Sequence, residues 1–375
     1  MRTKRIIIME AGEPNSNVVK KLHSLAGVQD FEPHLLYWGR GNSAVSYPLA
    51  SGIPKDRVHL VGMGGSKKSG IAARISVWRE CRQLLRKFKP WCVQSSSLDM
   101  LLVALVTIRP SGGFVFDLQD SRPWMRRWWI RLFIRAILNQ TRLVTVTSPR
   151  FESHFLRHYN LISRNQRVIC IPNPVDRSRF REYFPRPMDE DIVVGYIGTF
   201  RGATAICALA DAISLARQMG IPAKAFFAGI GPDQPLVNKL SRNSDFVAYT
   251  GPFDQSRDLA RLYGQVNMVY AVYDDTEDKK IHWPVRLGEA VFARVPIIVA
   301  SGSYMAEMIA VHGLGFEVPL GDAKAIVDVL ERVSRDRNII REISENCRRA
   351  ESLFAFERYE PEFLAAYRGL LDDAG

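Results

Sequence analysis

A glycine-containing turn near the middle of the sequence has the residue types of an anion-binding site. The segment 193–202 (VVGYIGTFRG) runs from an apolar stretch into a helical pattern, and its turn residues are Gly198, Thr199, Arg201 and Gly202. Glycine lets backbone N–H groups approach an anion closely, and the start of the following helix adds partial positive charge. Arg201 can pair with two phosphate oxygens at once. The turn therefore indicates a diphosphate site, and a plain strand-to-helix connection is the alternative.

Two later segments add residues that suit a nucleotide. Gly229 lies in a second glycine turn (FAGIGP, 227–232), which again follows an apolar run. Arg286 and Glu289 lie near the start of a predicted helix in the segment 284–300 (PVRLGEAVFARVPIIVA). A carboxylate at such a helix start can accept both hydroxyl groups of a ribose. Taken singly, Gly229 predicts a structural turn, and Glu289 predicts a partner of the helix dipole.

The first half offers a pair of carboxylates after a predicted strand. The segment 116–122 (FDLQDSR) ends at the edge where sheets of α/β proteins collect their ligands. Asp117 and Asp120 are therefore candidates for contacting a second substrate. Asp120 can orient or deprotonate a substrate hydroxyl, although an aspartate in this position caps a helix at least as often.

Directly after these carboxylates comes a segment rich in arginine and tryptophan. The segment 122–140 (RPWMRRWWIRLFIRAILNQ) predicts an amphipathic helix. Its characteristic side chains are Arg127, Arg131, Arg135, Trp124, Trp128 and Leu132. Arginine beside tryptophan suits the headgroup region of an anionic membrane, where an apolar body and a charged tip are both accommodated. A core helix with a solvated cationic face explains the same pattern equally well.

The elements that must position these residues form two similar series. Short β-rich runs alternate with longer helical patterns, which is typical of parallel sheets wrapped by helices. The strands predicted in the first series are 5–9, 34–38, 58–61, 91–94, 113–117, 143–147 and 167–171. Those predicted in the second series are 192–197, 225–228, 246–249, 268–272 and 296–299. Asp322 is the predicted N-cap of a later helix.

The sequence therefore predicts an α/β protein with two doubly wound domains. We expect a first domain over 1–172, a Pro-rich connection over 173–190 and a second domain over 191–350. We expect the segment 351–375 to form a helix that packs back on the first domain. Length supports this division, because 375 residues are enough for two hydrophobic cores.

Charge and composition narrow the function classes. The net charge is +17 over residues 1–190 and −5 over the remainder, so the first half suits an anionic partner such as a lipid surface or a nucleic acid. Five scattered cysteines form no metal-ligand or redox pair, and this indicates a reducing cytoplasm. We expect no signal peptide and no membrane span. The glycine spacing differs from G-x-G-x-x-G, which argues against a nicotinamide enzyme.

Taken together, the motifs of the second half resemble glycosyltransferase family 4 of the GT-B superfamily. The matching segments are IPNPVD (171–176), VGYIGTFRG (194–202), FAGIGP (227–232), YTGPF (249–253) and PVRLGEAVFARVPIIVA (284–300). The resemblance covers the second domain well and is looser over residues 1–170. It implies a GT-B fold, in which two Rossmann-like domains face a central cleft.

The resemblance also implies a reaction. A sugar would pass, with retention of configuration, from a nucleoside diphosphate sugar held by the second domain to an acceptor held by the first. Neither a metal nor a cofactor would be needed, because Arg201 and nearby N–H groups would stabilise the departing diphosphate. Gly198, Thr199, Gly202 and Gly229 would shape the donor site, Glu289 would hold the ribose, and Arg286 would take the place of the family's usual lysine.

Two departures from the family pattern affect these expectations. Family members often carry two glutamates separated by seven residues, but the position eight residues before Glu289 is Ile281. The carboxylate that would face the sugar is therefore either absent from this protein or supplied by Asp275, Glu277 or Asp278. In addition, the segment 10–17 (EAGEPNSN) stands where the family has a glycine-rich loop.

We therefore predict a hexosyltransferase-like enzyme that extends a lipid-linked glycan in surface polysaccharide biosynthesis. It would be cytoplasmic and peripheral on the inner face of the membrane, with no nucleic acid as a partner. An inverting GT-B transferase, with Asp120 as general base, is the first alternative. A basic nucleic-acid-binding protein and a non-catalytic scaffold are alternatives from other classes.

Overall fold

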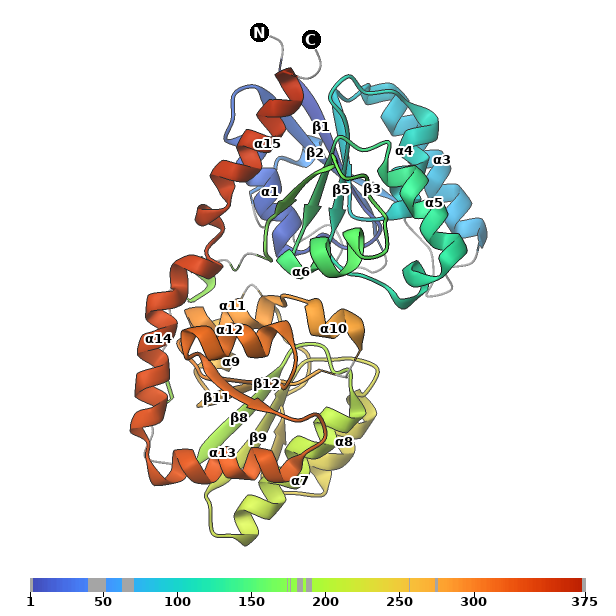
Figure 1. Ribbon diagram of the computed structural model, residues 1–375. Coiled ribbons are helices and arrows are strands. Elements are labelled where there is room, and N and C mark those ends of the chain that lie inside the picture. Colours follow the sequence, from blue (N-terminus) through green and yellow to red (C-terminus); the bar gives the residue numbers. More distant parts are fainter. Residues whose placement is uncertain are drawn as a thin grey trace. The chain divides into compact units, whose positions relative to one another are not determined.

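The computed structural model divides the chain into two compact units. Its described residues are 3–39, 52–62, 71–173, 175, 177–180, 185–186, 191–255, 257–273 and 276–372. The first unit consists of Met1–Pro174 with Phe356–Gly375, and the second consists of Val175–Ala355. Each unit is an α/β body with its own parallel sheet (Figure 1).

The sheet of the first unit has seven parallel strands in the order β3-β2-β1-β4-β5-β6-β7. Their bounds are β1 (Lys4–Glu10), β2 (Phe31–Trp38), β3 (Val58–Val61), β4 (Cys92–Ser95), β5 (Gly113–Leu118), β6 (Leu143–Val146) and β7 (Arg167–Cys170). The central strand β1 is apolar at consecutive positions, because helices cover both faces of a parallel sheet and Ile6, Ile7 and Ile8 are all buried. All seven predicted strands of the first series are confirmed.

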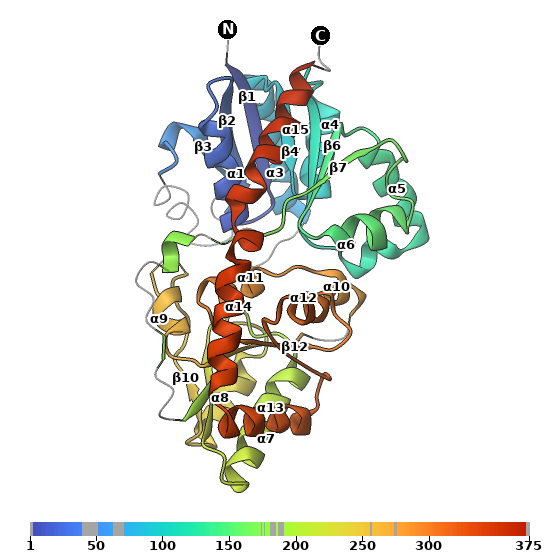
Figure 2. The same cartoon turned by 60° about the vertical axis from the view of Figure 1, so that its left-hand side comes forward.

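Helices from both ends of the chain cover this sheet. Its helical elements are α1 (Ser16–Ala26), η1 (Lys55–Arg57), α3 (Ile71–Phe88), α4 (Leu98–Thr107), η2 (Pro123–Arg126), α5 (Trp128–Leu138), α6 (Pro149–Phe151), η3 (Glu152–Arg157), η5 (Phe356–Arg358) and α15 (Glu360–Asp372). Helix α15 lies beside α1 on one face of the sheet, as both ribbon views show (Figure 2). The apolar side chains of α15, including Phe363 and Tyr367, are fully buried there.

A buried ion pair ties the helices of the first unit to its sheet. Lys21 on α1 contacts Asp117 on β5 at 2.7 Å, and both side chains are fully shielded from solvent. Asp117 also accepts hydrogen bonds from Thr145 and Gln94, and Gln94 in turn accepts one from Tyr367 of α15. Because a buried charge is costly without a partner, each member of this network depends on the others.

We expect Lys21→Met to lower the free energy of unfolding by about 3–5 kcal/mol, because it leaves the Asp117 carboxylate buried and unpaired. Lys224→Met is the matched control. It breaks a solvent-accessible ion pair with Asp191 at 2.8 Å and should cost less than about 1 kcal/mol. Chemical denaturation followed by circular dichroism measures both. Equal losses in the two variants would contradict the structural role of the buried pair.

The second unit has a six-stranded parallel sheet in the order β10-β9-β8-β11-β12-β13. Its strands are β8 (Ile192–Ile197), β9 (Ala223–Ala228), β10 (Val247–Tyr249), β11 (Met268–Ala271), β12 (Ile297–Ala300) and β13 (Gly315–Val318). The five predicted strands of this series are confirmed. Strand β13 was not predicted, because it is a short edge strand (GFEV) with only two apolar residues, Phe316 and Val318.

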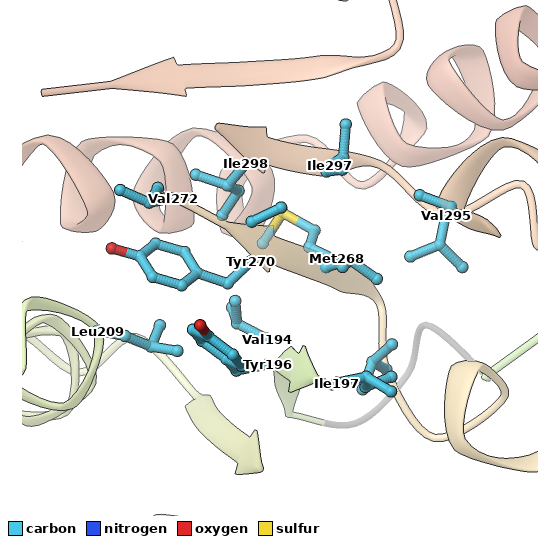
Figure 3. Close-up of a cluster of buried hydrophobic side chains, with 14 of the residues drawn as sticks. Val194, Tyr196, Ile197, Leu209, Met268, Tyr270, Val272, Val295, Ile297 and Ile298 are labelled. Atoms are coloured by element: carbon cyan, nitrogen blue, oxygen red, sulfur yellow. The ribbon is translucent and has the colours of Figure 1, made fainter. Parts of the chain in front are cut away.

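Helices cover both faces of the second sheet. They are η4 (Arg177–Phe180), α7 (Ala203–Gln218), α8 (Gln234–Arg242), α9 (Leu259–Tyr263), α10 (Glu277–Ile281), α11 (Val285–Phe292), α12 (Tyr304–His312), α13 (Ala323–Arg335) and α14 (Asn338–Phe354). Asp322 caps α13 by accepting a hydrogen bond from the Ala325 N–H, which confirms the predicted N-cap. The core includes two tyrosines on neighbouring strands, Tyr196 and Tyr270, whose rings lie side by side (Figure 3).

Candidate functional site

The two glycine turns of the second unit pack directly against each other. Gly198 follows β8 with φ +129°, and Gly229 follows β9 with φ +139°. A Cβ atom on Gly229 would lie 1.9 Å from the carbonyl oxygen of Gly198. A Cβ atom on Gly198 would lie 2.5 Å from Nη2 of Arg286. Both positions therefore require glycine, for their backbone conformation and for the close approach of their neighbours.

Arg286 is a buried cation held below the first turn. It lies on α11 and is only 8% exposed. Its guanidinium carbon lies 4.7 Å from the ring centroid of Tyr196 and 5.5 Å from that of Tyr273, so two aromatic rings offset part of the cost of burying its charge. Its Nη1 atom has no hydrogen-bond partner among the residues that the structure describes. A buried arginine with a spare donor can capture an anion that enters beside it.

Glu289 follows Arg286 after one turn of α11. It is 7% exposed, and it accepts a hydrogen bond of 3.0 Å from the hydroxyl group of Tyr263. Burial raises the pKa of Glu289, whereas the charge of Arg286 and the hydrogen bond from Tyr263 act in the opposite direction. Arg286 and Glu289 are thus both buried on α11 and interact electrostatically, and Arg286 lies directly under the Gly198 turn.

The other predicted donor-site residues lie on the same turn but are bonded differently. Thr199 and Arg201 are exposed, and the carbonyl oxygens of both accept the hydroxyl group of Tyr196 at 3.2 Å. The N–H of Gly202 donates to Oδ2 of Asp233 at 2.7 Å. This backbone donor at the start of α7 is therefore engaged with a carboxylate of the protein itself.

Several residues of this site were not found from the sequence. Tyr263 reaches it from α9 and Asp233 from the start of α8, whereas Tyr196 lies on β8 directly before the Gly198 turn; none of the three was assigned a role from the sequence. The only sequence signal was the position of Asp233 directly after the second glycine turn, where it is the N-cap residue of α8. Aromatic residues in apolar strands predict a core, and Tyr196 belongs to the core as well as to the site.

The carboxylate expected near Ile281 has two described candidates. Ile281 ends α10 and is buried, as an apolar side chain should be. Asp278 is also buried and lies 3.7 Å from Lys279, while Glu277 begins the same helix. Asp275 lies outside the described residues.

The first unit has a cavity at the carboxyl ends of its central strands. It has a volume of about 470 Å³, and its lining includes Glu10, Glu13, Asn15, Ser96, Gln119 and Asp120. Asp120 is 44% exposed and lies 3.6 Å from Arg122. Asp117 does not reach this cavity, because its carboxylate is fully buried against Lys21. The proposal that Asp117 contacts a second substrate is therefore wrong, and only Asp120 of the two carboxylates lines the cavity.

Helix α5 and the preceding η2 expose large apolar side chains to solvent. The exposed fractions are 45% for Trp124, 69% for Trp128, 54% for Trp129, 63% for Leu132 and 52% for Phe133. The helix packs on the first unit through Ile134, Ile137 and Leu138. Arg127 and Arg135 are exposed, and Arg131 lies over the ring of Tyr159 at 5.4 Å. Some apolar side chains of this segment therefore pack in the core and others are exposed. We call the exposed set the α5 surface (Trp124, Trp128, Trp129, Leu132 and Phe133).

No helix among the described residues is both long enough and apolar enough to cross a membrane. No three histidine, cysteine, aspartate or glutamate side chains in the described ranges gather closely enough to hold a metal ion.

Comparisons with known proteins agree with the architecture. Residues 191–336 match the family model described as Glycosyl transferases group 1. The chain is 26% identical over 302 residues to the succinoglycan biosynthesis protein ExoL of Rhizobium meliloti (strain 1021), an alignment that covers 73% of each protein.

Solved structures share the fold over nearly the whole chain. Sucrose-phosphate synthase from Thermosynechococcus elongatus is 18% identical with a TM-score of 0.73, covering 98% of this chain and 99% of that chain. Anabaena HepE in complex with UDP-glucose is 15% identical with a TM-score of 0.74, covering 98% and 100%. The chain is thus a glycosyltransferase with the GT-B fold, and the match to the Glycosyl transferases group 1 model covers its residues 191–336.

Proposed function

We propose that this enzyme transfers a sugar from a nucleoside diphosphate sugar to a lipid-linked glycan in surface polysaccharide biosynthesis, with retention of configuration. The observation that carries the donor assignment is the buried guanidinium of Arg286, which lies under the Gly198 turn with a spare donor at Nη1. The similarity to ExoL, whose name assigns it to succinoglycan biosynthesis, supports the polysaccharide context.

The donor chemistry follows from where charge develops. The bond between the anomeric carbon and the diphosphate oxygen breaks, and its electron pair leaves with the nucleoside diphosphate. Arg286 stabilises this new charge, with Arg201 as a second cation on the exposed side of the turn. Glu289 binds the ribose hydroxyls. The acceptor oxygen then bonds to the anomeric carbon, and its proton passes to the departing phosphate oxygen. Neither a metal ion nor a cofactor takes part.

A thermal-shift screen of UDP, GDP, ADP and CMP, with their common sugar derivatives, tests the donor assignment. A ligand that binds the folded protein raises its melting temperature by linkage. We expect UDP and a UDP-sugar to give the largest shift, because HepE, which has the same fold, was crystallised with UDP-glucose. If no nucleoside diphosphate shifts the midpoint, the chain is a non-catalytic scaffold and the proposed function is wrong.

The anomeric configuration of the product tests the stereochemistry. Retention is proposed from the family resemblance. Inversion is the alternative, because Ile281 supplies no carboxylate and Asp120 lines the cavity of the first unit, where it can act as a general base. Proton NMR of the first product formed separates the two, since the anomeric coupling constant differs between them.

The α5 surface supports a peripheral location on the inner face of the cytoplasmic membrane. Five large apolar side chains are exposed on one short segment, and such contiguous patches mark interaction sites. Arg127, which is the N-cap residue of α5, and Arg135 on α5 are both exposed. The segment can therefore contact anionic headgroups through its arginines and the acyl boundary through its apolar side chains. A lipid-linked acceptor would be reached from this position. We propose no nucleic acid partner, because the exposed residues that accompany these arginines are apolar.

We expect the triple variant Trp128→Ser, Trp129→Ser, Leu132→Ser to bind vesicles of phosphatidylglycerol and phosphatidylcholine at least about tenfold more weakly, because it removes most of the apolar area that would leave water. Cosedimentation at low and high salt measures the binding. Val311→Ser is the control, since Val311 is 76% exposed on the second unit. Unchanged vesicle binding by the triple variant would rule out the α5 surface as the membrane contact.

A further inference from the structure

Glu10 has a buried carboxyl group, and one of its two oxygen atoms makes no hydrogen bond to the described residues. It is the last residue of β1 and is 7% exposed. Its Oε2 atom accepts a hydrogen bond from the hydroxyl group of Ser96, which follows β4. Its Oε1 atom has no hydrogen-bond partner among the described residues. A buried polar atom without a partner costs free energy, so its retention at the edge of a cavity points to a ligand.

The cavity that Glu10 lines has the composition of a sugar site. Asn15 donates a hydrogen bond of 2.8 Å from its side-chain amide to Gln119, and both amides line the cavity. The hydroxyl groups of Ser96 and Ser97 and the half-exposed indole of Trp124 also line the cavity. Amide and hydroxyl groups match the hydroxyls of a sugar, and an indole covers the apolar face of its ring. The volume of about 470 Å³ lies within the range of small-molecule sites.

The surroundings of Glu10 favour its neutral form. Burial raises its pKa to about 8, and the charge of Asp117 acts in the same direction, whereas the hydrogen bond from Ser96 and the charge of Lys21 lower it. Asp117 and Lys21 largely cancel, because they pair with each other at 2.7 Å. The other charged groups around the cavity are Glu13, Asp99, Asp120, Arg74 and Arg122. Tyr37 on the neighbouring strand β2 lies opposite Glu10 in the strand register.

We propose that Oε1 of Glu10 binds a hydroxyl group of the acceptor sugar in this cavity, so that Glu10 determines acceptor specificity; this rests on the proposed function. A neutral carboxyl group donates a hydrogen bond through this oxygen while Oε2 keeps its bond from Ser96. It does not remove the acceptor proton, because it already carries one. A sugar that covers Glu10 removes the carboxyl group further from water and so disfavours its ionised form. Acceptor binding should therefore be strongest below about pH 8 and weaken as the pH rises through that value, where Glu10 loses its proton.

Three variants separate this role from a structural or a basic one. Glu10→Gln has the same shape, is always neutral and can donate from the position of Oε1, so it keeps acceptor binding and removes its pH dependence. Glu10→Ala loses the contact and should bind acceptor about tenfold more weakly at neutral pH. Glu13→Gln changes an exposed carboxylate of the same cavity and should keep the pH dependence of the wild type.

The probes are octyl β-glucoside and octyl β-galactoside, and their binding to the full chain is measured by saturation-transfer NMR from about pH 6 to about pH 9.5. The proposal is overturned if Glu10→Ala binds as the wild type does, or if Glu10→Gln loses as much affinity as Glu10→Ala. It is also overturned if neither glycoside binds the wild-type protein. In each of these cases, a melting shift with UDP or a UDP-sugar leaves the donor assignment standing, so the two failures are distinguishable.

Discussion

Replacing Arg286 with methionine should lower kcat/KM for sugar transfer by about 10²- to 10³-fold, the loss typical of removing one group that stabilises developing negative charge. Methionine fills much of the same volume next to Tyr196 and Tyr273, so the side chain changes in charge more than in packing. Steady-state kinetics with the donor found by the thermal-shift screen gives kcat/KM. Circular dichroism and the melting midpoint establish that the variant is folded.

Two further arginine variants make this result specific. Arg242→Met removes an exposed cation of α8 and should leave kcat/KM unchanged. Arg201→Met should give a smaller loss than Arg286→Met, since Arg201 is exposed and water screens its charge. If Arg201→Met proves the more damaging of the two, the diphosphate lies on the outer side of the turn and the role given to Arg286 is wrong.

Replacing Glu289 with glutamine should raise KM for the donor by about 10- to 100-fold, because the ribose hydroxyls lose a charged acceptor. Glutamine can still accept the hydrogen bond from Tyr263, so the local structure is retained. The pH dependence gives a second readout. Burial raises the pKa of Glu289, so donor affinity should fall with decreasing pH at a point above the usual titration range of carboxylates. The glutamine variant should lack this fall.

Tyr263→Phe is the matched test of that pH dependence. The hydrogen bond from Tyr263 favours the ionised form of Glu289 and lowers its pKa, so removing the hydroxyl group should move the acid limb to higher pH. An acid limb that stays in place in Tyr263→Phe, or that persists in Glu289→Gln, would show that another group is titrating. A donor KM unchanged in Glu289→Gln would remove Glu289 from the ribose site.

The parts of the site that could be predicted from the sequence are those with local signals. Gly198 and Gly229 follow apolar strands at tight turns, so each is marked by its immediate neighbours. Glu289 was expected near a helix start, but it lies beyond the first turn of α11 (Val285–Phe292). The structure adds that the two turns pack together and that Arg286 lies beneath one of them. The strands were predicted for the same reason, except β13, whose alternation is too short to separate it from a loop.

The parts that could not be predicted depend on contacts between distant residues. Asp117 and Asp120 are three residues apart and chemically alike, yet one pairs with Lys21 inside the unit while the other lines the cavity. Lys21 lies 96 residues from Asp117 in the chain, and its ion pair with Asp117 leaves only Asp120 available to contact a ligand. Glu10 could not be predicted for the same reason. Its oxygen atom Oε1 lacks a hydrogen-bond partner among the described residues because the side chain is buried beside β4, and no neighbour in the sequence indicates this.

The docking of α15 on the first unit has a consequence for the order in which the protein matures. Tyr367 and Phe363 belong to the core of the first unit, but the ribosome makes them only after the whole of Val175–Ala355. The core of the first unit therefore cannot be completed until the second unit has been synthesised. The first unit must wait, with part of its apolar interior uncovered, until these residues leave the exit tunnel. The half of the enzyme that is translated first is thus the last to be finished.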